Sequence, residues 1–221
     1  MGHYLLMNIK GQNQAAIAGT AEGFLKTLQR YGFLGTLRLV RDVLFSKCLS
    51  SEVRLIRYPF YLRGRSCIQF GKGFTSGVGL RIDAFGSKPN QVIFGANVEV
   101  GDYVHIGALD SVVIGDNVLM ASKVYISDHD HGIYQGDHVS PASQIQSQKS
   151  LQIEPVLIGN NVWLGENVCI LKGVKIGENS IIGASSVVTK SIPANSIAIG
   201  IPARVVKQYN STTNEWVAVN G

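Results

Sequence analysis

Three of the five histidines lie in one polar segment, residues 127–157. Two of them, His129 and His131, stand in the string Ser-Asp-His-Asp-His-Gly, where an aspartate precedes each histidine. A carboxylate beside an imidazole can hold the ring in one tautomer, as a general base requires. The segment therefore predicts proton-transfer chemistry by one of these two histidines, with Asp128 as a partner. The spacing alone does not separate the two.

A hexapeptide period surrounds this segment and must position it. An aliphatic or aromatic residue recurs every six positions, often followed by Gly and, four places on, by Val. The clearest members are Phe94, Val100, Ile106, Ile114, Met120 and Ile126 upstream, and Ile158, Leu164, Ile170, Ile176, Ile182 and Val188 downstream. A period of six is neither the 3.6 of a helix nor the 2 of a strand, so each unit must be a short strand and a corner. Three units make one coil of a triangular prism.

This period predicts an all-β solenoid over residues 66–207, with residues 127–157 extruded as a loop and residues 208–221 as a C-terminal tail. The composition agrees, because 25 glycines and 16% charged residues suit tightly turning β structure. The three cysteines are scattered and odd in number, so neither a disulfide framework nor a CxxC metal motif is expected.

The Ile-Gly-x-x-x-x pattern resembles that of the hexapeptide-repeat acyltransferases over residues 66–207. The strings at residues 71–79 and 127–132, together with the N-terminal arm, are most similar to the O-antigen and capsular polysaccharide O-acetyltransferases of bacteria. This resemblance implies a left-handed parallel β-helix, acetyl-CoA as the donor, and homotrimers with sites between subunits. It also implies a sugar hydroxyl of a surface polysaccharide or its precursor as the acceptor, and no metal.

The resemblance also implies roles for individual residues. In similar enzymes a histidine at the start of the extruded loop removes the proton of the acceptor hydroxyl, which then attacks the thioester directly. His129 matches that histidine by its place after Ile126, and His131 is the second candidate. Relatives often carry a polar residue near His105 that contacts the acceptor, although a hydrogen-bonded corner residue is an equally good account of His105. Asp110, in a two-residue insertion in the period, would be the acidic acceptor-binding residue.

The cofactor residues follow from the same resemblance. Trp163 would line the cofactor, and the backbone at Gly165 and Glu166 would face the thioester oxygen, where many relatives have a small residue in place of Glu166. Ala184 would pair with the pantetheine amides. The residues that would meet the CoA phosphates are Thr189, Lys190, Arg204 and Lys207.

Positive charge is concentrated at the N-terminus. Residues 1–66 carry ten Lys and Arg against three Asp and Glu, whereas the whole chain has a net charge of only +5. Residues 1–65 are expected to form a basic amphipathic helical arm broken near Gly32 or Gly35. Such an arm usually packs on its own domain, but it also suits a cytoplasmic enzyme at the inner membrane. No pattern typical of nucleic-acid binding or of a signal peptide is present.

Three alternatives remain open from the sequence. N-acetylation of an amino sugar differs only in the nucleophile. A zinc protein of the γ-carbonic anhydrase type would use three histidines, for which His105, His129 and His131 are available. A non-catalytic scaffold would bind no CoA. Calorimetry with acetyl-CoA and zinc analysis separate the acyltransferase, zinc-protein and scaffold classes, and thiol release with a panel of sugars tests the acceptor.

Overall fold

The computed structural model describes residues 21–86 and 88–219, without the side chains of residues 21 and 22. The described residues fall into two compact units, divided in the sequence between residues 45 and 46. The start of the expected arm, residues 1–20, lies outside the described residues.

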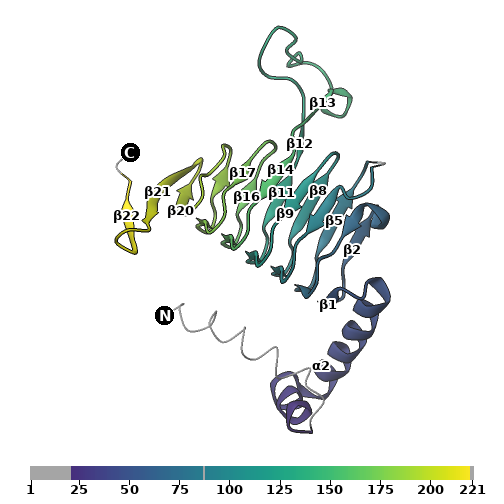
Figure 1. The fold of residues 1–221 in the computed structure, drawn as a ribbon. Helices are drawn as coiled ribbons and strands as arrows, with labels where there is room; N and C mark the ends of the chain where they lie inside the picture. Colours follow the sequence, from purple (N-terminus) through teal and green to yellow (C-terminus); the bar gives the residue numbers. More distant parts are fainter. Residues whose placement is uncertain (1–20, 87, 220–221) are drawn as a thin grey trace. The chain divides into compact units, whose positions relative to one another are not determined.

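The larger unit is a β-solenoid of about seven coils. Figure 1 shows its short strands stacked coil on coil. Three sheets of parallel strands form its three faces, here called sheets A, B and C. Sheet A contains β1 (Val53–Ile56), β4 (Phe74–Ser76), β7 (Glu99–Val100), β10 (Leu119–Met120), β15 (Trp163–Leu164), β18 (Ile181–Ile182) and β20 (Ser196–Gly200). Sheet B contains β2 (Tyr61–Arg63), β5 (Arg81–Ala84), β8 (His105–Ala108), β11 (Tyr125–Ser127), β16 (Cys169–Ile170) and β19 (Val187–Val188). Sheet C contains β3 (Ile68–Gln69), β6 (Val92–Phe94), β9 (Val112–Ile114), β14 (Val156–Ile158) and β17 (Lys175–Ile176).

The residues of the hexapeptide period form the core. All twelve positions named from the sequence are buried, and they stack in three columns, one behind each sheet. Asparagines make the sharp corners between sheets C and A, because Asn tolerates the left-handed backbone. Asn117 and Asn161 have φ of 56°, and their side-chain amides hydrogen-bond from coil to coil at 3.2 Å. The predicted solenoid is confirmed, but its first strands are β1 and β2, so residues 53–63, expected to belong to the helical arm, are part of the solenoid instead.

The extruded loop begins and ends on its own small ladder. After β11 the chain leaves sheet B as β12 (His129–His131), which pairs antiparallel with β13 (Leu151–Ile153). The short 3-10 helices are η1 (Arg65–Cys67) near the start of the solenoid and η2 (Gln146–Gln148) within the loop. The loop projects from the side of the solenoid in Figure 1 and rejoins it at β14. This ladder places His129 at the foot of the loop, next to the outer surface of sheet B.

Both ends of the described chain depart from the hexapeptide pattern. The helix α2 (Ala21–Leu49) has non-helical backbone at Gly32, with φ of 68° and ψ of 175°, so the break expected near Gly32 or Gly35 falls at the first. No stretch of α2 is apolar enough to cross a membrane. At the other end β21 (Ala203–Asn210) and β22 (Glu215–Ala218) continue sheet A as an antiparallel hairpin. The boundary expected at residue 207 thus falls inside β21.

Candidate active site

The Asp128 carboxylate lies fully buried at the start of the loop. Its Oδ2 accepts hydrogen bonds from the backbone N–H groups of Leu109, Asp110 and Ser111 at 3.0, 2.7 and 2.9 Å. These three residues lie at the two-residue insertion in the period. There the chain turns so that three successive N–H groups point to one oxygen, which makes a concave anion site. With three donors on one oxygen there is no place there for a proton. We therefore assign Asp128 as ionised, since charge-assisted hydrogen bonds offset its burial.

The His129 ring is held by that carboxylate. Its Nδ1 lies 2.8 Å from Asp128 Oδ1, and because an ionised carboxylate only accepts, Nδ1 carries the proton. The other ring nitrogen, Nε2, is then left with a lone pair. The Ser127 hydroxyl fixes the backbone at the same place: it accepts from the His129 N–H at 3.2 Å and donates to the His129 carbonyl at 2.8 Å. This arrangement suits a general base.

The second histidine of the string has different surroundings. His131 is exposed on β12, and within the described residues its ring has no hydrogen-bond partner. Only its carbonyl is engaged, accepting from the Tyr134 hydroxyl at 2.6 Å. Asp130 is exposed as well. The structure therefore gives a carboxylate partner to His129 and not to His131.

The two expected acceptor residues are engaged in different ways. His105 Nε2 lies 3.0 Å from Oδ2 of Asp83, a carboxylate buried on β5. The Asp110 carboxylate accepts a hydrogen bond from Lys88 at 2.6 Å and raises the pKa of that amine, while the Asp110 backbone serves Asp128. Sequence reasoning missed Asp83. The available signal was its position directly after the core residue Ile82, where the repeat usually has Gly.

The His129 ring lies over a glycine of sheet B, Gly107. Gly107 pairs in register with Asp83 on one side and with Ser127 on the other. A Cβ built on Gly107 would lie 3.4 Å from His129 Cε1, so the imidazole lies over this residue on sheet B. The His129 ring therefore lies over the residue that pairs with Asp83 in sheet B.

A cysteine also lies on the outer face of this sheet. Cys169 pairs in register with Tyr125, and burial raises the pKa of its thiol. The reactive form of cysteine is the thiolate, which is scarce when the pKa is raised. Cys169 is therefore poorly suited to act as a nucleophile.

The residues expected to contact the cofactor start on sheet A. Trp163 belongs to β15, and its indole N–H is buried without a hydrogen-bond partner among the described residues. Gly165 and Ala184 stack in successive coils, so closely that a Cβ on Gly165 would lie 2.6 Å from the Ala184 nitrogen. The Glu166 carboxylate lies 3.6 Å from the Lys123 ammonium, and the Glu166 carbonyl accepts from the Ser185 N–H at 2.7 Å.

The four residues expected at the CoA phosphates are all exposed. Thr189 and Lys190 follow β19, whereas Arg204 and Lys207 lie on β21. Because all four side chains are exposed, an anionic cofactor could reach each of them. These residues therefore fit the group that the sequence implied. His129 and Trp163 nevertheless extend from different sheets.

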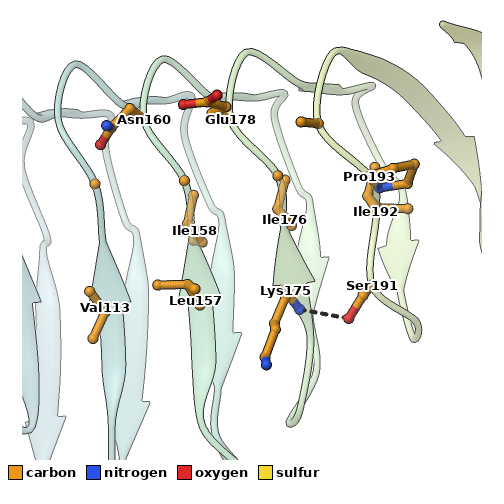
Figure 2. Close-up of a pocket in the computed structure, with 14 residues that line it drawn as sticks. Val113, Leu157, Ile158, Asn160, Lys175, Ile176, Glu178, Ser191, Ile192 and Pro193 are labelled. Carbon is orange, nitrogen blue, oxygen red and sulfur yellow. Dashed lines mark hydrogen bonds between the residues drawn. The ribbon is translucent and has the colours of Figure 1, made fainter.

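A shallow groove of about 760 Å³ lies elsewhere, on the outer face of sheet C and the adjoining corner. Figure 2 shows Val113, Leu157 and Lys175 side by side along it, with the Lys175 N–H donating to Ser191 Oγ at 3.0 Å. None of the residues expected to be catalytic or to bind substrates lines this groove. In the part of the chain that the structure describes, no three His, Cys, Asp or Glu side chains are arranged to hold a metal ion.

Comparisons with known proteins agree with this architecture. A family model described as "Bacterial transferase hexapeptide (six repeats)" matches residues 155–190. An Escherichia coli protein named "Putative lipopolysaccharide biosynthesis O-acetyl transferase WbbJ" is 47% identical over 193 residues, which cover 87% of this chain and 97% of that protein.

Two solved structures share the fold at low sequence identity. The hexapeptide-repeat containing acetyltransferase VCA0836 from Vibrio cholerae is 19% identical with a TM-score of 0.54, and the alignment covers 87% of this chain and 96% of that one. AntD, an N-acyltransferase from Bacillus cereus solved with dTDP and 3-hydroxybutyryl-CoA, is 18% identical with a TM-score of 0.60, covering 73% and 82%. The expected fold, a left-handed parallel β-helix with an N-terminal helical arm and an extruded loop, is confirmed. The chain belongs to the hexapeptide-repeat acetyltransferase family.

Proposed function

We propose that the protein transfers the acetyl group of acetyl-CoA to a sugar hydroxyl of a bacterial surface polysaccharide, an O-antigen or capsule, or of its precursor. The observation that carries this proposal is the Asp128–His129 pair, in which His129 Nδ1 lies 2.8 Å from a fully buried carboxylate. The printed name of the Escherichia coli relative, an O-acetyl transferase of lipopolysaccharide biosynthesis, supports the choice of oxygen and of glycan.

The reaction proceeds by direct transfer in a ternary complex. His129 Nε2 takes the proton of the acceptor hydroxyl as the oxygen attacks the thioester carbonyl carbon. The Gly165 N–H already donates to the Ile182 carbonyl at 2.8 Å, so the Glu166 N–H is the donor of this pair that would stabilise the developing oxyanion. The carbon–sulfur bond then breaks, and the departing thiolate recovers the proton from His129 Nε2. The raised pKa of Cys169 agrees with a route that needs no acyl-enzyme.

The active unit in this proposal is a homotrimer with sites between subunits. His129 stands at sheet B and Trp163 on sheet A, so one chain presents the two halves of a site on different faces. Sheet C offers a surface for association, because Leu157 is 44% exposed and lies beside Val113 in the groove of Figure 2. Burying such a patch favours oligomers over isolated chains.

The helical arm would hold this cytoplasmic enzyme at the inner membrane. In α2 the side chains of Phe33, Leu37 and Leu44 are 68%, 51% and 64% exposed, whereas Thr36 and Asp42 are buried. The three apolar residues share one helical face. Arg41, which forms an ion pair with Asp42, lies beside that face, an arrangement that suits the surface of anionic lipid. Vesicles containing phosphatidylglycerol should therefore co-sediment with the wild type and much less with a Leu37→Glu, Leu44→Glu variant. Equal sedimentation of both proteins would contradict the membrane contact.

Calorimetry with acetyl-CoA, followed by thiol release with a panel of sugars and amino sugars, tests the proposed function. Micromolar binding and turnover with neutral hydroxyl acceptors are expected. Absence of CoA binding would overturn the proposal in favour of a scaffold or, if zinc is found in stoichiometric amount, of a hydrase. Turnover only with amino sugars would instead establish an N-acetyltransferase.

A further inference from the structure

A second buried carboxylate lies next to the candidate base. The Asp83 side chain is 2% exposed, and its Oδ2 accepts from Arg81 Nε at 2.6 Å and lies 3.0 Å from His105 Nε2. Its Oδ1 lies 3.4 Å from Arg63 Nε but has no hydrogen bond. Two guanidinium groups and one imidazole thus converge on a single carboxylate.

The position of this cluster relates it to the chemistry. Asp83 and Gly107 are partners on adjacent strands of sheet B, and the His129 ring lies over Gly107. The cluster is on the N-terminal side of His129, in coils that precede the loop. The residues expected to bind the cofactor begin at Trp163 and lie in later coils. A substrate at Asp83 would therefore approach His129 from the side opposite to the cofactor.

The charges and exposure of the cluster indicate its ligand. Arg63 and Arg81 are 62% and 43% exposed, and each meets Asp83 only through Nε. Among the described residues their terminal Nη groups have no partner. The two guanidinium groups therefore offer four unpaired Nη nitrogens to a ligand. Two guanidinium charges exceed the one carboxylate charge. Several donors around a net positive charge match the oxygens of a phosphate better than the two oxygens of a carboxylate.

We propose that Arg63 and Arg81 bind a phosphate of the acceptor, so that the sugar acetylated at His129 is a phosphorylated or diphosphate-linked sugar. Asp83 is a positioning residue that aligns both guanidinium groups. The exposed Tyr125 ring, 5.4 Å from the His105 ring, supplies a flat surface where the sugar itself can lie. This inference rests on the proposed function, because it concerns the acceptor of the same site.

Calorimetry on the full chain saturated with CoA tests the proposal, because the cofactor phosphates then cannot be confused with the new site. The probes are glucose 1-phosphate, glucose and glucuronate. We expect binding of glucose 1-phosphate that weakens about tenfold or more in an Arg63→Gln, Arg81→Gln variant. The matched control, Arg54→Gln with Lys72→Gln, also removes two positive charges and should bind within about twofold of the wild type.

The outcomes separate this proposal from the proposed function. Failure of the wild type to bind CoA refutes acetyl transfer. In that case glucose 1-phosphate is titrated into the protein without CoA, and this titration still tests the phosphate site. No binding of glucose 1-phosphate, equal loss in both variants, or equally tight binding of glucuronate would overturn the phosphate site. Unchanged CoA affinity of the Arg63→Gln, Arg81→Gln variant shows that this variant is folded. If its CoA affinity is lost, the single variant Arg63→Gln, at an exposed position, is tested in its place. Uridine diphosphate and farnesyl diphosphate are then compared. Tighter binding of the first indicates that the acceptor sugar is carried on a nucleotide, and tighter binding of the second indicates a prenyl carrier.

Discussion

Asp128 shows how one buried carboxylate sets the chemistry of its neighbour. Three backbone N–H groups occupy its Oδ2, so Oδ1 is directed at His129 Nδ1. Because the donors belong to a rigid corner of the solenoid, the imidazole is oriented before a substrate arrives. Such preorganisation lowers the barrier to proton transfer without any rearrangement at the moment of reaction.

Replacing Asp128 by Asn tests this orientation. The amide N–H₂ would face Nδ1 if the carbonyl oxygen stays on the backbone donors, which would move the ring proton to Nε2 and remove the base. We expect kcat to fall by about 10²–10⁴-fold, the range that a general base contributes. Acetyl-CoA affinity, measured by calorimetry, should not change. A kcat within about threefold of the wild type would contradict the assigned tautomer.

At this scale the sequence predicted residue types better than pairings. The string at residues 127–132 identified both histidines, and only the fold places one beside Asp128 and the other on an exposed strand. The acceptor-binding role of the Asp110 carboxylate stays a prediction, whereas the sequence did not indicate that this carboxylate accepts from Lys88 or that the Asp110 backbone N–H donates to Asp128. Asp83 was missed because its partners come from other coils, 18 or more residues away in most cases.

Among the elements, the coils were predictable and the additions to them were not. A six-residue period defines which residues are inside, so the core columns and the site of the loop follow from local pattern. The β12–β13 ladder and the β21–β22 hairpin depend on long-range pairing of residues without a period. The break in α2 at Gly32 could be foreseen because Gly is the residue that adopts positive φ without strain.

The asparagine corner offers a test of what holds the coils together. Asn161 has φ of 56°, and its amide links Asn117 and Asn179 at 3.2 and 3.0 Å. Asn161→Ala should lose those hydrogen bonds and also leave in the left-handed region a residue without the short polar side chain that makes this conformation accessible to Asn, at a cost of up to about 1–2 kcal/mol. Asn161→Gly should lose only the hydrogen bonds. Thermal unfolding should rank the proteins wild type, then Gly, then Ala, whereas equal midpoints for the two variants would contradict a role for the backbone conformation.

At the scale of the whole molecule, the solenoid places the candidate base and the candidate cofactor residues on two different faces. A prism with short strands can place only a few outward residues on each coil, so the candidate base on sheet B and Trp163 on sheet A cannot share one face. The proposed trimer resolves this by setting one chain against the next.

Mixed oligomers test that arrangement. Co-expression of His129→Ala chains with Trp163→Ala chains should yield hetero-oligomers in which some sites combine an intact His129 with an intact Trp163. We expect the mixture to recover a measurable fraction of wild-type thiol release, although each variant alone is impaired. Recovery no greater than the sum of the separate variants would mean that each site is built within one chain.

The central claim is that His129 is the base for acetyl transfer, and steady-state thiol release with the best acceptor of the sugar panel tests it most directly. Wild type, His129→Ala and His131→Ala are compared, each with its acetyl-CoA affinity. The account predicts loss of about 10²-fold or more in kcat for His129→Ala alone, with unchanged acetyl-CoA binding in all three proteins. Full turnover by His129→Ala, or an equal loss in His131→Ala, would contradict it.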